Sequence, residues 1–136
     1  MQTKCVLVIN SDLPIGLSAN TAAILGCSLG TLHPEINGKQ LTDAENGIYP
    51  GIVQIPLPVL EASSSRISEM QKEVLNLEQI EVLSFVDCAQ QAKNYLEYAT
   101  QLRQSKHEQL QFLGICLYGQ AKLVNHFTGG DLPILK

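Results

Sequence analysis

Charged side chains are scarce in this sequence. They make up 16% of the 136 residues, as 9 Lys and Arg against 13 Asp and Glu, for a formal net charge of −4. The basic residues are spread thinly, whereas nucleic-acid binding depends on clustered basic side chains that neutralise phosphates. We therefore do not expect a nucleic-acid partner. A surface with so few charges often belongs to an interface, so we expect a homodimer.

Long apolar runs, a signal architecture and metal-ligand spacings are also lacking. No stretch approaches the roughly 18 consecutive apolar residues of a membrane span, and the apolar run at residues 6–9 is too short for a signal core. The four cysteines and three histidines show no metal-finger spacing, and no glycine-rich cofactor motif is present. These absences predict a cytoplasmic protein that contacts no membrane and uses no metal or cofactor.

Apolar residues, in contrast, are plentiful enough for one packed core. Hydrophobic residues make up 45% of the chain, and Leu, Ile, Val and Phe number 42. Their share of about 31% exceeds the roughly 20% below which disorder is typical. The length of 136 residues matches a single domain of about 100–200 residues.

Hydrophobic periodicity predicts strands that alternate with helices. Strands are predicted at residues 5–9, 81–86 and 110–118, with an edge strand within 52–60 and a short last strand at 132–135. Helices are predicted at residues 17–32, 67–77, 88–103 and 122–127, and a hairpin over 38–49 around Asn46-Gly47. This order predicts a single-domain α/β fold, with a mixed four- to five-stranded sheet flanked by helices.

The first predicted helix carries a stripe of small residues at helical spacing. Small residues let another backbone come close. The stripe therefore either packs on the sheet or receives a ligand or partner subunit, which is a second reason to expect a homodimer. The stripe consists of Ala19, Ala22, Ala23, Gly26 and Gly30.

Polar residues follow the predicted strands, where open α/β sheets commonly bind ligands. Asp12 comes directly after the first strand, and Tyr118 ends the last long strand. Asn20 and Asn125 lie in the helices that follow these two strands. The first hypothesis is therefore a pocket for a small ligand, at the carboxyl ends of the strands, formed by Asp12, Asn20, Tyr118 and Asn125.

Asp87 carries the alternative hypothesis. It lies between the predicted strand at 81–86 and the next helix, so its carboxylate either caps free N–H groups of that helix or faces the pocket. In the second case Asp87 is a general base of a hydrolase that acts on a small ester or amide, with Asn20 or Asn125 polarising the carbonyl. Asp12 has the same capping alternative.

Several segments together resemble a known family. The resemblance is carried by four segments: K-C-V-L-V-I-N-S-D-L at residues 4–13, Y-P-G-I at 49–52, I-P-L-P-V-L at 55–60 and V-N-H-F-T-G at 124–129. These segments are similar to the domain of unknown function 2000 family. The likeness covers nearly the whole chain. It implies the fold of the archaeal and eukaryotic-type peptidyl-tRNA hydrolases, the peptidyl-tRNA hydrolase 2 fold.

The hydrolase site that this resemblance implies is incomplete here. The catalytic aspartate of those hydrolases corresponds to Asp87. Those hydrolases have a lysine-rich glycine loop that contains a histidine, whereas this sequence has Pro-Ile-Gly-Leu-Ser at residues 14–18. They also have an aspartate near the C-terminus, where this sequence has Asn125. Proteins that share a fold can carry different functional sites. Peptidyl-tRNA hydrolysis is therefore less favoured than either ligand binding or hydrolysis of a small ester or amide.

Overall fold

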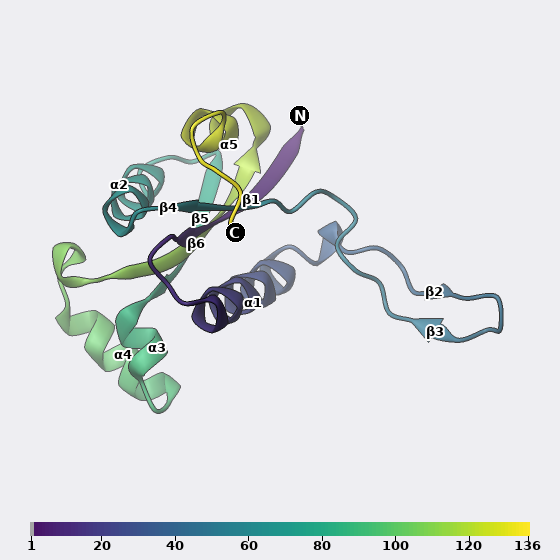
Figure 1. Cartoon of the computed structure of the whole chain (residues 1–136), viewed down its shortest axis with the longest axis horizontal. Helices are drawn as coiled ribbons and strands as arrows, with labels where there is room; N and C mark the ends of the chain where they lie inside the picture. Colours follow the sequence, from purple (N-terminus) through teal and green to yellow (C-terminus); the bar gives the residue numbers. More distant parts are fainter. Residues whose placement is uncertain (1) are drawn as a thin grey trace.

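The fold is built around a central strand with a partner on each side. In a computed structural model that describes residues 2–136, β1 (Thr3–Asn10) pairs in parallel with β4 (Val59–Ala62) and antiparallel with β6 (Phe112–Gln120). β5 (Ile80–Val86) pairs antiparallel with the other side of β6. The resulting order β4-β1-β6-β5 (Figure 1) confirms the predicted single-domain α/β fold with a mixed sheet.

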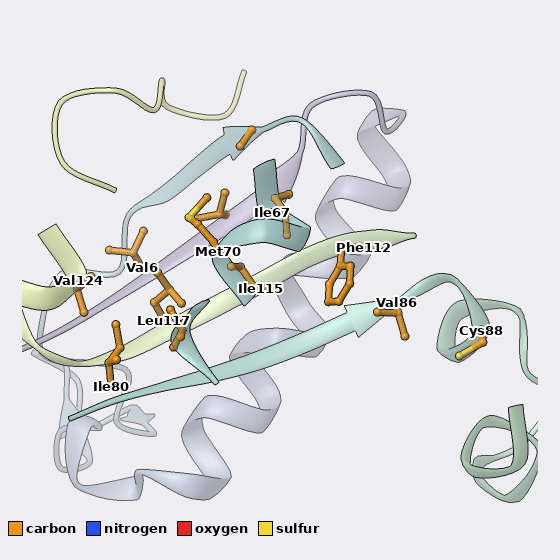
Figure 2. Packing of buried hydrophobic residues seen from close by; sticks show 13 residues of the cluster. Val6, Ile67, Met70, Ile80, Val86, Cys88, Phe112, Ile115, Leu117 and Val124 are labelled. Carbon is orange, nitrogen blue, oxygen red and sulfur yellow. The ribbon is translucent and has the colours of Figure 1, made fainter. Parts of the chain in front are cut away.

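Helices cover both faces of this sheet. α1 (Ile15–Leu32) lies on one face, and α2 (Ser64–Val74) and α5 (Ala121–Thr128) lie on the other (Figure 1). Side chains of β1 alternate between two buried layers: Leu7 and Ile9 pack with α1, whereas Val6 and Val8 pack with α2 and α5. Figure 2 shows the layer of α2 and α5. The central strand is apolar on both faces because both are covered.

A glycine in β6 sets the close contact between α1 and the sheet. A Cβ atom at Gly114 would lie 2.7 Å from Cγ2 of Thr21 and 3.0 Å from Cδ1 of Ile9. Only glycine lets the helix backbone approach this closely. The predicted small-residue stripe does not make this contact, because Ala19 and Ala23 are exposed on α1. The hypothesis that the whole stripe packs on the sheet is therefore wrong.

α1 has an unusual composition for a helix at a protein surface. None of its 18 residues is charged, and in length and hydropathy it is the one helix within residues 2–136 that meets the criteria for a membrane span. Its buried residues, which include Thr21, Leu25 and Leu29, face the sheet. The core helix of a soluble protein meets the same criteria.

A hairpin extends from the body of the molecule. β2 (Leu41–Thr42) and β3 (Ile48–Tyr49) form the predicted hairpin, which points away from the sheet (Figure 1). Asn46 has a φ of 65°, a left-handed conformation that Asn adopts more readily than most residues. We call residues 38–52 the arm. It leaves the body just after the 3₁₀ turn η1 (Pro34–Ile36) that follows α1.

The helix predicted at 88–103 is two helices, α3 (Asp87–Gln91) and α4 (Tyr95–Gln104). The break occurs because Asn94 accepts a hydrogen bond from the N–H of Glu97 at 2.8 Å and so begins a new helix. Asn favours such local bonds over the interior of a helix. A second 3₁₀ turn, η2 (His107–Gln109), leads from α4 into β6.

Prolines delay the predicted edge strand. β4 begins at Val59, directly after Pro56 and Pro58, which have no N–H to donate to a sheet. The predicted last strand forms a single bridge, between Ile134 and Leu60. This C-terminal segment lies along the outer edge of β4, and covering an edge in this way protects it from pairing with other chains.

Candidate functional site

The direction of β6 separates the predicted site residues into two groups. Because β6 is antiparallel to β1, its carboxyl end lies beside the amino end of β1, and Tyr118 is opposite Cys5. Tyr118 and Asn125 therefore lie at the opposite end of the sheet from Asp12 and Asp87, which follow the carboxyl ends of β1 and β5. The structure does not bring the four predicted ligand-binding residues together. Asn20 is exposed on α1.

At the carboxyl end of β1, a buried asparagine rather than Asp12 organises the turn. The side chain of Asn10 donates to the carbonyl of Phe112 at 3.1 Å and accepts from the N–H of Asp12 at 2.9 Å. Asp12 is exposed, and the residue that precedes α1 is Pro14, so Asp12 does not cap the helix. The capping alternative for Asp12 is thus wrong.

Asp87 is the first residue of α3 and is half-buried. Its Oδ1 accepts from the N–H of Cys88 at 2.9 Å and from the N–H of Gln111 at 3.3 Å. Within residues 2–136 its side chain bonds to backbone groups, and neither a histidine nor a hydroxyl is positioned to act with it. Asp87 therefore joins the start of α3 to the segment that enters β6.

The amino end of β1 holds a cluster of polar side chains that we call the His33 cluster: His33, Glu35, Glu81 and Tyr118. His33 ends α1, and its Nε2 lies 2.7 Å from Oε2 of Glu81 while its Nδ1 lies 3.3 Å from Oε1 of Glu35. Both ring nitrogens therefore face carboxylate oxygens. The ring stacks on Tyr118 with centroids 3.7 Å apart.

Two members of the His33 cluster have shifted pKa values. The pKa of Glu35 lies below its ordinary value, first because its own backbone N–H donates to the carboxylate and further because His33 is adjacent. The pKa of Tyr118 is raised by partial burial and by the negative charge of Glu35. Glu35 is therefore an anion at neutral pH, and the neutral Tyr118 hydroxyl donates to it at 3.4 Å.

Glu35 and Tyr118 form one wall of a cavity of about 520 Å³, which we call the β1 cleft. The cleft is lined by Gln2, Thr3, Glu35, Ile36, Gln54, Ile55, Pro56 and Tyr118. A neighbouring cavity of about 350 Å³ shares four of these residues and adds Lys4 and Asn125, whose side chains are hydrogen-bonded to each other. Two of the predicted residues, Tyr118 and Asn125, thus line adjoining cavities at this end of the sheet.

A third cavity, of about 340 Å³, lies beside the carboxyl half of β5. Its lining includes Ser84 and Phe85 of β5, Lys93 between α3 and α4, and Tyr95 at the start of α4. This cavity is the nearest to the position that the sequence predicted. It holds no cluster of paired ionised groups like that around His33.

The sequence had no signal for the His33 cluster. The histidines show no metal-ligand spacing, and His33 and Glu81 are 48 residues apart along the chain. Only the antiparallel pairing of β5 and β6 places Glu81 opposite Tyr118. Within residues 2–136, no three His, Cys, Asp or Glu side chains are arranged to hold a metal ion.

Together these features define a single-domain α/β protein with a mixed four-stranded sheet and a polar cleft at the amino end of its central strand. A family model described as "Protein of unknown function (DUF2000)" matches residues 3–135, and the chain belongs to this family. The family inferred from the sequence is confirmed.

One solved structure is closely similar. It is that of the protein of unknown function Atu0240 from Agrobacterium tumefaciens strain C58, with a TM-score of 0.90 and 15% sequence identity. The similarity covers 100% of this chain and 99% of that chain, so the whole fold is shared. No curated protein matches the sequence.

Proposed function

We propose that the protein binds a small molecule in the β1 cleft, and that the ligand carries a protonated amine. The observation that carries this proposal is the ionised Glu35 carboxylate on the wall of the cleft, held in place by His33 and Tyr118. The volume of about 520 Å³ lies within the ~300–1,000 Å³ typical of ligand pockets.

The composition of the cleft supports a ligand with one charged and one apolar end. Ile36, Ile55 and Pro56 form an apolar wall, whereas Thr3 and Gln54 add polar groups that fix orientation. The His33 cluster contains two carboxyl groups and no Lys or Arg, which favours a cationic group. Burying the apolar part of the ligand supplies affinity, and the carboxylate supplies selectivity.

The His33 cluster favours binding over catalysis. Both nitrogens of His33 are engaged by carboxylates, so the ring has no free nitrogen with which to accept a proton. The raised pKa of Tyr118 keeps its hydroxyl neutral. Groups whose rotamers are held by their neighbours are suited to recognition, because little order is lost when the ligand arrives.

A thermal-shift experiment tests the proposal. We expect primary amines such as benzylamine to raise the Tm of the wild type by mass action, and the neutral analogue benzyl alcohol to raise it much less. Glu35→Gln should abolish the difference between the two compounds, and Tyr118→Phe should reduce it. Lys93→Ala, in the cavity beside β5, is the matched control and should respond like the wild type. An amine response that survives in Glu35→Gln contradicts the proposal.

The two hydrolase hypotheses find less support. Oδ1 of Asp87 accepts from two backbone N–H groups, which is a structural role, and no histidine or hydroxyl in residues 2–136 is hydrogen-bonded to this carboxylate to act with it. The relationship to the peptidyl-tRNA hydrolase fold stays a proposal, supported by the position of Asp87 after a strand and by the residues at 124–129. The residues at 14–18 do not supply the lysine and histidine that this resemblance implies.

A further inference from the structure

We propose that the arm docks on a second copy of this chain, against the outward face of its α1, so that two chains form a two-fold dimer. The arm and the outward face of α1 are two separate surfaces of one chain. Each has apolar or uncharged side chains that are exposed to solvent. A two-fold axis covers both surfaces in both copies at once.

The arm presents large apolar side chains to solvent. Leu41 is 68% exposed, Ile48 66%, Tyr49 55% and Ile52 78%. Leu41, Ile48 and Tyr49 lie on a two-stranded hairpin that points away from the sheet (Figure 1), and Ile52 lies at the base of the arm, where its carbonyl accepts from the N–H of Gly38. A hairpin of this kind is marginally stable in water on its own. Contact with another surface would remove the apolar area from water and support the hairpin.

The tip and the base of the arm are ordered by local contacts. Asp43 accepts hydrogen bonds from the N–H groups of Glu45 and Gly47, both at 2.8 Å, and from the Tyr49 hydroxyl at 3.0 Å. At the base, Gly51 lies so close to the carbonyl of Gly38 that a Cβ atom at Gly51 would overlap the carbonyl oxygen. An ordered arm loses little conformational freedom on docking, which favours association.

The outward face of α1 fits such an arm. Ala19, Ala23 and Cys27 are exposed on this face, and the helix has no charged residue. Small side chains leave a shallow surface that other side chains approach closely. The helix is ~27 Å long at ~1.5 Å per residue, and the six residues 38–43 of the arm reach ~20 Å at ~3.3 Å per residue.

The accessible surface of the chain exceeds that of a compact monomer. It is 8692 Å², against roughly 7,000 Å² for a folded monomer of 14.9 kDa. The excess of about 1,700 Å² is larger than the ~800 Å² that each partner buries in a standard stable interface. The chain therefore has enough surface outside its compact body to form a stable dimer.

Charge favours a second copy over a lipid surface. Helices that lie on membranes carry Lys and Arg on their polar face to attract anionic lipids. α1 has no Lys or Arg, and the tip of the arm carries Asp43 and Glu45. The acidic tip would be repelled by anionic lipids but has no like charge to face on α1 of a second copy.

The mass in solution tests the dimer. Light scattering of the wild type across micromolar concentrations should report roughly twice 14.9 kDa. Ile52→Glu on the arm and Ala23→Arg on α1 should each give the monomer mass, because each buries a charge in the proposed interface. Both positions are exposed, so both variants should keep the Tm of a folded chain. Leu96→Glu is the control, since Leu96 is also exposed, on α4, and should leave the dimer intact.

The reactivity of Cys27 locates the interface. Of the four free cysteines, Cys27 is exposed and the other three are buried. Its labelling by a thiol reagent should be slow in the concentrated wild type and at least tenfold faster in Ile52→Glu. A monomer at every concentration overturns the proposal. So does a dimer that persists in Ile52→Glu with Cys27 reactive, which would point to another interface such as the open edge of β5.

Discussion

Among the single side chains, His33 links the most distant parts of the sequence. It ends α1, contacts Glu35 in η1, bonds to Glu81 of β5 and stacks on Tyr118 of β6. Its side chain is only 16% exposed, so these contacts are partly shielded from water. Two of the side chains that His33 contacts, Glu35 and Tyr118, line the β1 cleft, so His33 positions part of the cleft wall.

Glu35 gives this cluster a dependence on pH. Its pKa in the folded state is lowered from 4.5, first by the hydrogen bond from its own backbone N–H. A group with a lowered folded pKa stabilises the fold above its unfolded pKa, and this contribution is lost as the pH falls through the folded pKa. We expect the Tm advantage of the wild type over Glu35→Gln to be present at neutral pH and to shrink below about pH 4.5. Thermal unfolding of both proteins between about pH 7 and pH 3 measures it. A difference that stays constant over this range contradicts the account.

Asp87 provides a second prediction about a single residue. If its role is to accept backbone N–H groups, Asp87→Asn should cost little stability, because an amide oxygen accepts the same bonds. Asp87→Ala should cost about 1 kcal/mol, as the loss of a capping oxygen does. Urea unfolding of the three proteins measures both effects. Amine binding in the β1 cleft should be the same in all three, and its loss in Asp87→Asn would assign Asp87 to the site.

Among the elements, the contact of α1 with β6 depends on Gly114. We expect Gly114→Ala to destabilise the fold by about 1–3 kcal/mol, because the new methyl group would press on Thr21 and Ile9. Gly26→Ala is the matched control. Its Cβ would meet nothing within 4 Å, so it should stabilise the helix by about 0.4–1 kcal/mol. Urea unfolding in the Ile52→Glu background, where we expect a monomer, separates these effects from association. Equal changes in stability for the two substitutions would contradict the role of Gly114 in the contact between α1 and β6.

The elements themselves were largely predictable from the sequence. Runs that are apolar on both faces predicted β1, β5 and β6, because buried central strands require them. The helix predicted at 88–103 was wrong in one respect, since the cap at Asn94 outweighs the helical periodicity of the alanines and leucines around it. The edge strand begins later than the apolar run at 52–60 suggests, because Pro56 and Pro58 within that run have no N–H to donate to a neighbouring strand.

For the molecule as a whole, the candidate site was much less predictable than the fold. Strand order and direction decide which residues meet, and no local pattern distinguishes an antiparallel β6 from a parallel one. Tyr118 and Asn125 were therefore predicted at the wrong end of the sheet, although both line cavities. The fold is shared with Atu0240 at 15% sequence identity, so the same architecture forms from two very different sequences. The cytoplasmic location and the lack of a nucleic-acid partner stay predictions.

The most direct test of the proposed function is to map where an amine binds. Backbone amide NMR shifts of isotope-labelled protein are recorded as benzylamine is added, and again with benzyl alcohol. The account predicts that benzylamine moves the signals of Thr3, Glu35, Gln54 and Tyr118, that the alcohol moves them far less, and that Glu35→Gln removes the difference. Shifts that are centred instead on Asp12 and Asp87, or on Lys93 and Tyr95, would contradict it.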